Sequence, residues 1–141
     1  MLELFIHAAV LLVLFQLKHF LADFPLQTPA MLGKFNREGW LKPLAQHAYV
    51  HAIITLAIAS FYLGLRGDVA TIPYFTLTWG LALFDFLAHG TMDRIKASPD
   101  LLGRYKITEK YFWWALGLDQ MWHHLTHYII IGVLLYVVHF A

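Results

Sequence analysis

The chain has 141 residues, of which 60% are hydrophobic and only 13% are charged. Ordinary soluble domains carry about 25% charged residues, and a chain this small cannot bury so large an apolar fraction in its own interior. The composition therefore argues against an ordinary soluble domain, the net charge of +1 gives nucleic-acid binding no support, and the lack of cysteine excludes disulfides and thiolate metal sites.

Apolar runs long enough to cross a membrane occur four times along the chain. We expect spans at about 2–22, 47–65, 73–89 and 124–140, the last with an alternative start near Thr108. The first run lacks the basic flank and the cleavage site of a signal peptide, so we expect it to be retained. The long connections cover residues 24–46 and 91–110. The sequence thus predicts one all-α domain over residues 1–141, an integral membrane bundle of about four transmembrane helices.

Lysine and arginine are concentrated in these two connections. Residues 24–46 contain three of them and residues 91–110 contain five, whereas the short turn between the second and third spans contains only Arg66. Because positively charged connections remain in the cytoplasm, we expect both long connections on that side of the membrane. The two chain termini are then expected outside.

Ionisable side chains gather near one end of every span. The sets are His19 and Asp23; His47 and His51; Asp85, His89 and Asp93; and Asp119, His123 and His127. Since the spans alternate in direction, all four sets are expected at the cytoplasmic level. Neighbours within each set are four residues apart, so they lie on one helix face. Six such pairs occur here, against about two expected by chance along the whole chain.

We interpret these ten residues as a divalent metal centre. Imidazole and carboxylate groups suit zinc first, with manganese or iron(II) as alternatives, and ten candidates are enough for one ion or two. In the stretch DFLAHGTMDRIK we expect His89 and Asp93 to bind metal directly. Asp85, one turn deeper, is expected to serve a second ion or to orient a histidine. The alternative is a polar cluster that only holds helices together.

A metal centre of this type favours hydrolysis, in which the metal activates water and polarises a phosphoryl or acyl oxygen. We assign catalytic roles to Asp119 and Lys96, the latter as a contact for phosphate. The depth of the site suits a membrane lipid or a lipid-linked phosphoester as substrate. Three alternatives stay open, namely a non-enzymatic membrane protein, a metal-ion transporter or binding protein, and a membrane di-iron oxygenase. The sequence also leaves a homo-oligomer open.

Three stretches together resemble domain-of-unknown-function family 3307, small membrane proteins of bacteria and phages. They are HFLADFPLQT at 19–28, HGTMDRIK at 89–96 and DQMWHH at 119–124. The resemblance implies a bacterial cytoplasmic (inner) membrane location and a more distant similarity to membrane-bound metal-dependent hydrolases. It places these residues on motif positions: His19, Asp23, Gln27, His89, Asp93, Lys96, Asp119, Gln120 and His123. His47 matches the isolated histidine that begins the second span.

Overall fold

The computed structural model describes residues 1–65 and 72–140, without the side chains of residues 72 and 73. Within these ranges the chain is helical and contains no strand, which confirms the all-α class. The elements are α1 (Leu2–Asp23), η1 (Pro29–Phe35), α2 (Leu41–Gly64), α3 (Ile72–Ala97), η2 (Leu102–Arg104) and α4 (Lys110–Phe140). Arg66, which entered the prediction of orientation, lies outside the described residues.

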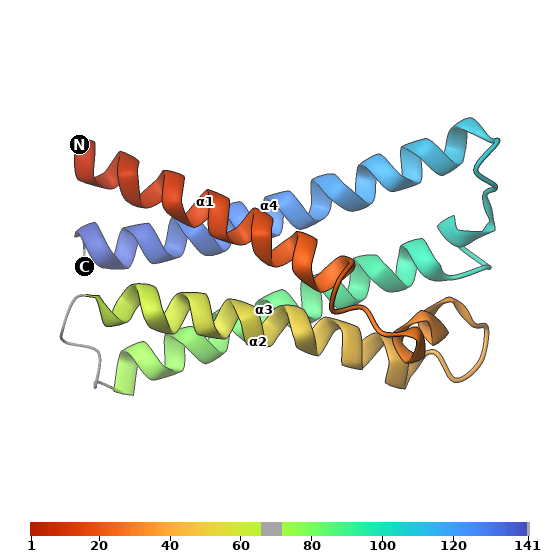
Figure 1. The fold of residues 1–141 in the computed structure, drawn as a ribbon, viewed down its shortest axis with the longest axis horizontal. Helices are drawn as coiled ribbons and strands as arrows, with labels where there is room; N and C mark the ends of the chain where they lie inside the picture. The colour runs from red at the N-terminus through yellow and green to blue at the C-terminus, as the bar shows by residue number, and fades with distance from the viewer. Residues whose placement is uncertain (66–71, 141) are drawn as a thin grey trace.

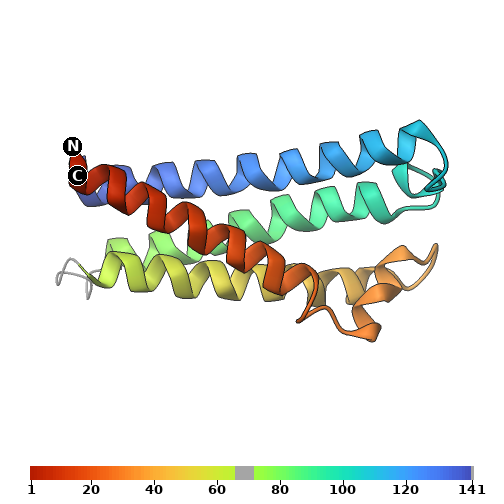
Figure 2. The ribbon, with the colours of Figure 1, turned by 45° about the horizontal axis from the view of Figure 1, so that its top comes forward.

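Each of the four long helices runs antiparallel to the one before it in the chain (Figures 1 and 2). Both chain termini lie at one end of the bundle, and the connections from α1 to α2 and from α3 to α4 lie at the other. We call this second end the basic end, because its connections contain the lysine- and arginine-rich segments. The most extensive packing joins α2 to α3, and η1 packs on both of these helices.

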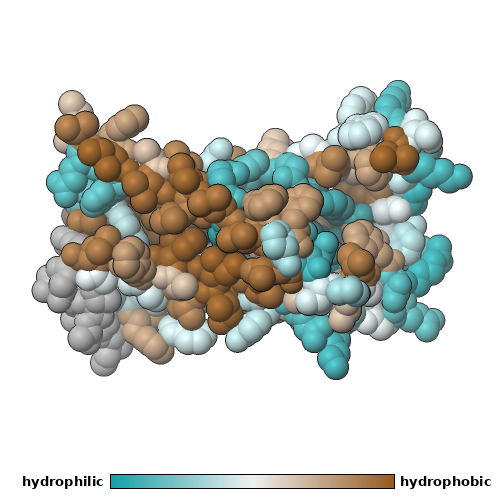
Figure 3. Space-filling view, in the orientation of Figure 1, coloured by the Kyte–Doolittle hydropathy of each residue, from teal (hydrophilic) through white to brown (hydrophobic). Residues whose placement is uncertain are grey.

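Three helices, α1, α2 and α4, are long and apolar enough to cross a membrane. α3 is not among them, and its second half contains Asp85, Asp93, Arg94 and Lys96. Figure 3 shows a broad hydrophobic surface over the left and central parts of the molecule and hydrophilic residues at the basic end. The structure therefore supports a membrane protein with three candidate spans.

Two of the helices begin well before the apolar runs that predicted them. α2 begins at Leu41 rather than near residue 47, and Pro43 lies in its first turn, where no helical hydrogen bond is lost. α4 begins at Lys110, close to the alternative start near Thr108. Hydropathy detects only the apolar middle of such a helix, because the added turns contain polar and aromatic residues.

An apolar core fills the half of the bundle nearest the termini. It consists of Leu11, Phe15, Ala59, Tyr62, Leu63, Leu81, Ile130, Ile131 and Leu134. On the terminal side a small polar cap covers it, in which His7 Nδ1 lies 2.9 Å from Tyr62 Oη and 3.1 Å from His139 Nε2. In a bilayer such a core stabilises the bundle by close packing rather than by exclusion of water. The ionisable residues of the predicted centre occupy the other half.

The arrangement of the helices predicts opposite accessibility for the two ends. The chain contains no cysteine, so a single introduced cysteine reports on one position. Glu38 lies in the connection at the basic end, Glu3 lies beside the N-terminus, and both residues are exposed. The two variants are Glu38→Cys and Glu3→Cys. We expect a membrane-impermeant maleimide added to intact cells to label Glu3→Cys and to leave Glu38→Cys unlabelled until the cells are lysed. Labelling of Glu38→Cys from outside would show that the orientation is reversed.

Candidate metal centre

The four long helices bring ionisable side chains together at one level in the half of the bundle nearest the basic end. Asp23 is the last residue of α1, and α2 contributes His47 and His51 from successive turns. α3 contributes His89 and Asp93 in the same way. α4 adds Asp119 and His123. The pairs spaced by four residues therefore point inward together, as the helical period predicts.

One group of donors consists of Asp23, His47, His51 and His89, whose candidate ligand atoms all lie within 4.8 Å of one another. Asp23 Oδ1 is 3.1 Å from His51 Nε2 and 3.3 Å from His47 Nε2. His89 Nε2 is 3.2 Å from His47 Nε2 and 4.0 Å from the same Asp23 oxygen. The three histidines are buried, whereas the Asp23 side chain is 20% exposed, so this group opens toward solvent at one carboxylate.

A second group consists of His89, Asp93 and His123, all buried. Asp93 Oδ2 is 3.7 Å from His89 Nε2, and Asp93 Oδ1 is 4.0 Å from His123 Nε2. Asp119 lies beside this group, with Oδ1 3.1 Å from His123 Nε2. His89 belongs to both groups, so the two groups share one imidazole.

The spacing of these atoms fits a small cation. Four donors placed about 2.0–2.1 Å from a zinc ion in a tetrahedron lie about 3.3 Å apart. The closest contacts between donor atoms of the first group, from 3.1 to 3.3 Å, match this donor–donor distance. His47 Nε2 also faces Asp93 Oδ2 at 3.1 Å. One imidazole N–H can satisfy only one of these neighbours, whereas a cation satisfies all of them at once.

Ring stacking holds the histidines in place. The rings of His51 and His89 stack with centroids 3.5 Å apart, and those of His89 and His123 stack at 4.1 Å. Metal-binding histidines usually donate their other nitrogen to a carboxylate or carbonyl oxygen. Here Nδ1 of His47, His51 and His89 has no hydrogen-bond partner among the described residues. Stacking between rings and the contacts of Nε2 atoms with Asp23 and Asp93 therefore constrain the ring orientations.

His19 lies at the edge of the centre and outside both groups. Its Nε2 is 3.2 Å from Asp23 Oδ2 and 3.3 Å from Gln120 Oε1. Its ring also contacts that of His123, with centroids 5.1 Å apart. It therefore contacts a predicted ligand, Asp23, through the oxygen that does not face the first group, and it links the end of α1 to α4.

Asp85 and His127, both expected in the metal centre, also lie outside the two donor groups. Asp85 is about 6 Å farther along α3 than His89, since it is one helical turn deeper. Its Oδ2 accepts hydrogen bonds from Lys18 Nζ at 2.6 Å and from Thr55 Oγ1 at 2.7 Å. His127 Nε2 lies 3.2 Å from the same Lys18 nitrogen. These residues form a buried polar layer between the donor groups and the apolar core.

Lys18 is a residue of this polar layer that the sequence interpretation missed. It lies inside an apolar run, one position before His19, and its side chain is fully buried. A lysine inside a predicted span is itself a warning of a buried partner, because a lone charge is too costly there. Only the fold shows that the partner is Asp85, 67 positions away in sequence.

Two more lysines close the centre at the basic end. Lys34 on η1 is buried and pairs with Asp93 Oδ2 at 2.5 Å. Lys96 on α3 pairs with Asp119 Oδ2 at 2.6 Å and is 32% exposed. In the sequence, Lys34 contributed only to the prediction of orientation, since nothing near it indicates burial. Both lysines neutralise carboxylates that flank the second donor group.

Comparison of the chain with family models, curated proteins and solved structures gives no match. The resemblance to family 3307 therefore stays an expectation based on the three motifs. What the structure supports is a buried group of histidines and aspartates able to hold a metal ion.

The shared position of His89 predicts how variants lose metal. Because His89 is in both donor groups and Asp23 in only one, His89→Ala should remove at least one equivalent of metal and should impair both groups. Asp23→Ala should remove no more than one equivalent of metal. The measurement is elemental analysis of protein purified in detergent without chelator and resupplied with zinc, manganese or iron(II). His7→Ala, at the far end of α1, is the matched control and should bind as the wild type does. Wild-type protein without stoichiometric metal would refute the centre.

The Lys18–Asp85 pair predicts a large effect on stability. Lys18→Met leaves a carboxylate without its cation inside the bundle, which typically lowers the free energy of unfolding by about 3–5 kcal/mol. Replacing both partners with Lys18→Met and Asp85→Leu should restore most of that loss, since an apolar pair needs no compensation. Denaturant titration in detergent, followed by circular dichroism, measures both effects. Equal midpoints for the single and double variants would show that the pair is not coupled.

Proposed function

We propose that this protein is a metal-dependent hydrolase of the membrane that acts on a lipid or lipid-linked phosphoester. The observation that carries the proposal is the convergence of Asp23, His47, His51 and His89 at zinc-like spacing. Zinc is the metal that this nitrogen and oxygen donor set suits best, and manganese or iron(II) are the alternatives.

In this proposal α3 also crosses the membrane, which brings the number of spans to four. The protein lies in the bacterial cytoplasmic membrane. α3 packs on both α2 and α4, so it cannot leave the bundle without exposing its buried polar residues to lipid. Its charged side chains face partners within the bundle, as Asp85 and Asp93 do. The lysine- and arginine-rich connections are cytoplasmic, and both termini lie outside.

Access to the centre from one side favours catalysis over transport. The apolar core fills the bundle between the metal centre and the end that holds the termini. At the basic end, by contrast, the Asp23 and Lys96 side chains are partly exposed. A substrate can therefore approach at the level of the cytoplasmic headgroups, where phosphoesters of lipids lie. An enzyme needs access from this one side alone, whereas a transporter must also open its site toward the other side in turn.

A divalent ion in this centre would lower the pKa of water and polarise a phosphoryl oxygen. The chain supplies the remaining functions. Asp119 holds His123 by its Oδ1 oxygen and Lys96 by its Oδ2 oxygen, so one carboxylate fixes a donor and a cation together. Lys96 is partly exposed and pairs with Asp119 beside the second donor group, so its ammonium group is placed to balance the charge of a phosphate. Asp119 is the acceptor for a proton released beside it.

Hydrolysis is tested with substrates of increasing similarity to lipids. Metal-loaded and chelator-treated protein are compared on bis(p-nitrophenyl) phosphate, p-nitrophenyl phosphate, p-nitrophenyl acetate and phosphatidylglycerol vesicles. We expect turnover of at least one phosphoester that depends on metal. Metal-loaded protein that hydrolyses none of the four would refute the hydrolase and leave the metal centre intact. Stoichiometric iron with a visible absorption band would instead favour the di-iron oxygenase.

The contact between Lys96 and phosphate can be tested separately from metal binding. Lys96→Ala should lower kcat/KM for the phosphoester about tenfold, the usual effect of losing one charged hydrogen bond, and metal content should not change. Lys96→Arg should retain most of the activity because it keeps the charge. Lys110→Ala removes an exposed lysine at the same end and is the control. Equal activity of Lys96→Ala and Lys110→Ala would exclude Lys96 from the site.

A further inference from the structure

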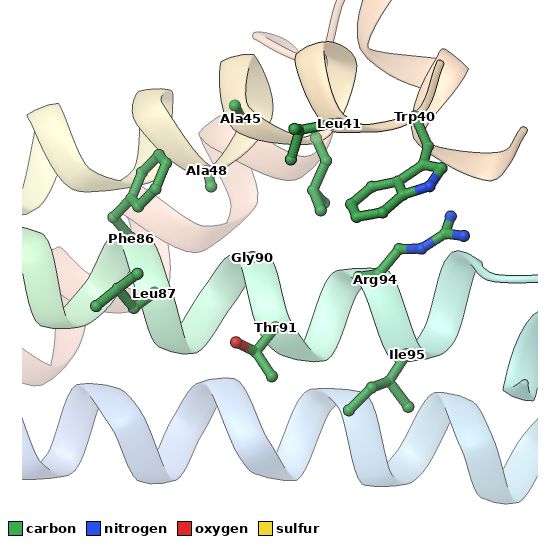
Figure 4. Close-up of a pocket in the computed structure, with 11 residues that line it drawn as sticks. Trp40, Leu41, Ala45, Ala48, Phe86, Leu87, Gly90, Thr91, Arg94 and Ile95 are labelled. Carbon is green, nitrogen blue, oxygen red and sulfur yellow. The ribbon is translucent and has the colours of Figure 1, made fainter. Parts of the chain in front are cut away.

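An apolar groove of about 390 Å³ runs along the outer face of α2 and α3 near the basic end (Figure 4). It is separate from the metal centre, because the histidines of these helices point into the bundle. Its volume falls within the usual range for ligand-binding pockets. The lining residues are Trp40, Leu41, Leu44, Ala45, Ala48, Phe86, Leu87, Gly90, Thr91, Arg94 and Ile95.

Small residues form the floor of the groove. A Cβ atom built on Gly90 would lie 3.6 Å from the Cβ of Ala48, which is ordinary van der Waals contact. The two helices therefore meet at this point without larger side chains between them. Gly90 and Ala48 both line the groove, so a side chain longer than alanine at position 90 would compete for this space.

Arg94 lies at one end of the groove and is the only basic residue in its lining. Its guanidinium group stacks 4.0 Å from the ring of Trp40. Its Nη1 donates hydrogen bonds to the carbonyl oxygens of Lys34 and Asn36, each at 3.3 Å. These contacts hold the guanidinium group in place and use only one of its three nitrogens.

The charge of Arg94 is not balanced within the described part of the chain, where it forms no ion pair with a carboxylate. Lys34 and Lys96 pair with aspartates of the metal centre, and neither lysine lines the groove. A half-buried guanidinium group beside apolar residues favours an anionic partner, and its planar donors suit phosphate oxygens. Trp40 beside it is the type of residue found at the headgroup level of a bilayer.

We propose that this groove binds an anionic glycerophospholipid, with one acyl chain along α2 and α3 and the phosphate on Arg94. The polarity of the groove gives the orientation. Arg94 and Trp40 are at the basic end, and Phe86 lies about 12 Å deeper, since it is eight residues earlier on the same helix. The lipid phosphate therefore meets the guanidinium group while its hydrocarbon covers the leucines and Phe86. This site does not require metal or hydrolysis.

The test is native mass spectrometry of protein released from detergent that contains equal amounts of phosphatidylglycerol and phosphatidylcholine. We expect the wild type to retain one lipid and to prefer phosphatidylglycerol. Arg94→Gln should lower this preference about tenfold, as expected for one charged hydrogen bond. Arg104→Gln removes an exposed arginine that contacts Tyr105 at the same end, and it should leave the preference unchanged.

Occupancy of the groove itself is measured with Gly90→Leu, which should reduce the retained lipid of either type. Circular dichroism confirms that each variant is folded, and Arg94→Gln provides an independent measurement if Gly90→Leu does not fold. An unchanged preference in Arg94→Gln, or an equal loss in Arg104→Gln, would overturn the assignment of the phosphate to Arg94. Unchanged retention in a folded Gly90→Leu would overturn the groove as the site.

Discussion

A carboxylate inside an apolar bundle must have a cation or hydrogen-bond donors beside it, and this requirement determines the interior of the protein. All three buried aspartates of the described residues have a lysine partner within 2.6 Å, and each pair joins two different elements. The pairs are Lys18–Asp85, Lys34–Asp93 and Lys96–Asp119. Because apolar helices in lipid gain little from burying hydrophobic surface, such pairs fix the rotation and depth of one helix against another. The histidines can then converge between them.

Much of the site could be predicted because its residues follow the helical period. Pairs such as His47 and His51 or His89 and Asp93 reveal a face, and the alternation of spans places all faces at one level. The period does not show which faces meet. Thus the convergence of Asp23 with three histidines, the separation of His127 from them and the pairing of Asp85 with Lys18 became visible only in the fold.

The fold was predictable to a similar extent. The apolar runs indicated helices in the correct order, because length and hydropathy decide which segments can cross a bilayer. The runs did not indicate η1, which folds back against α2 and α3 and carries the buried Lys34. Such a segment is short and mixed in composition, and its structure depends on contacts with helices distant in sequence. Local patterns contain no information about those contacts.

The imidazole that the two donor groups share creates a choice of coordination. The Nε2 atom of His89 has one lone pair, so it can complete one group at a time. With His89 the first group has four protein donors, which is the closed arrangement of structural zinc sites. Without it that group keeps Asp23, His47 and His51, and three protein donors with an open fourth position are typical of catalytic zinc. If an ion binds here, the position of one imidazole ring would therefore decide between a closed site of four protein donors and a site with an open position.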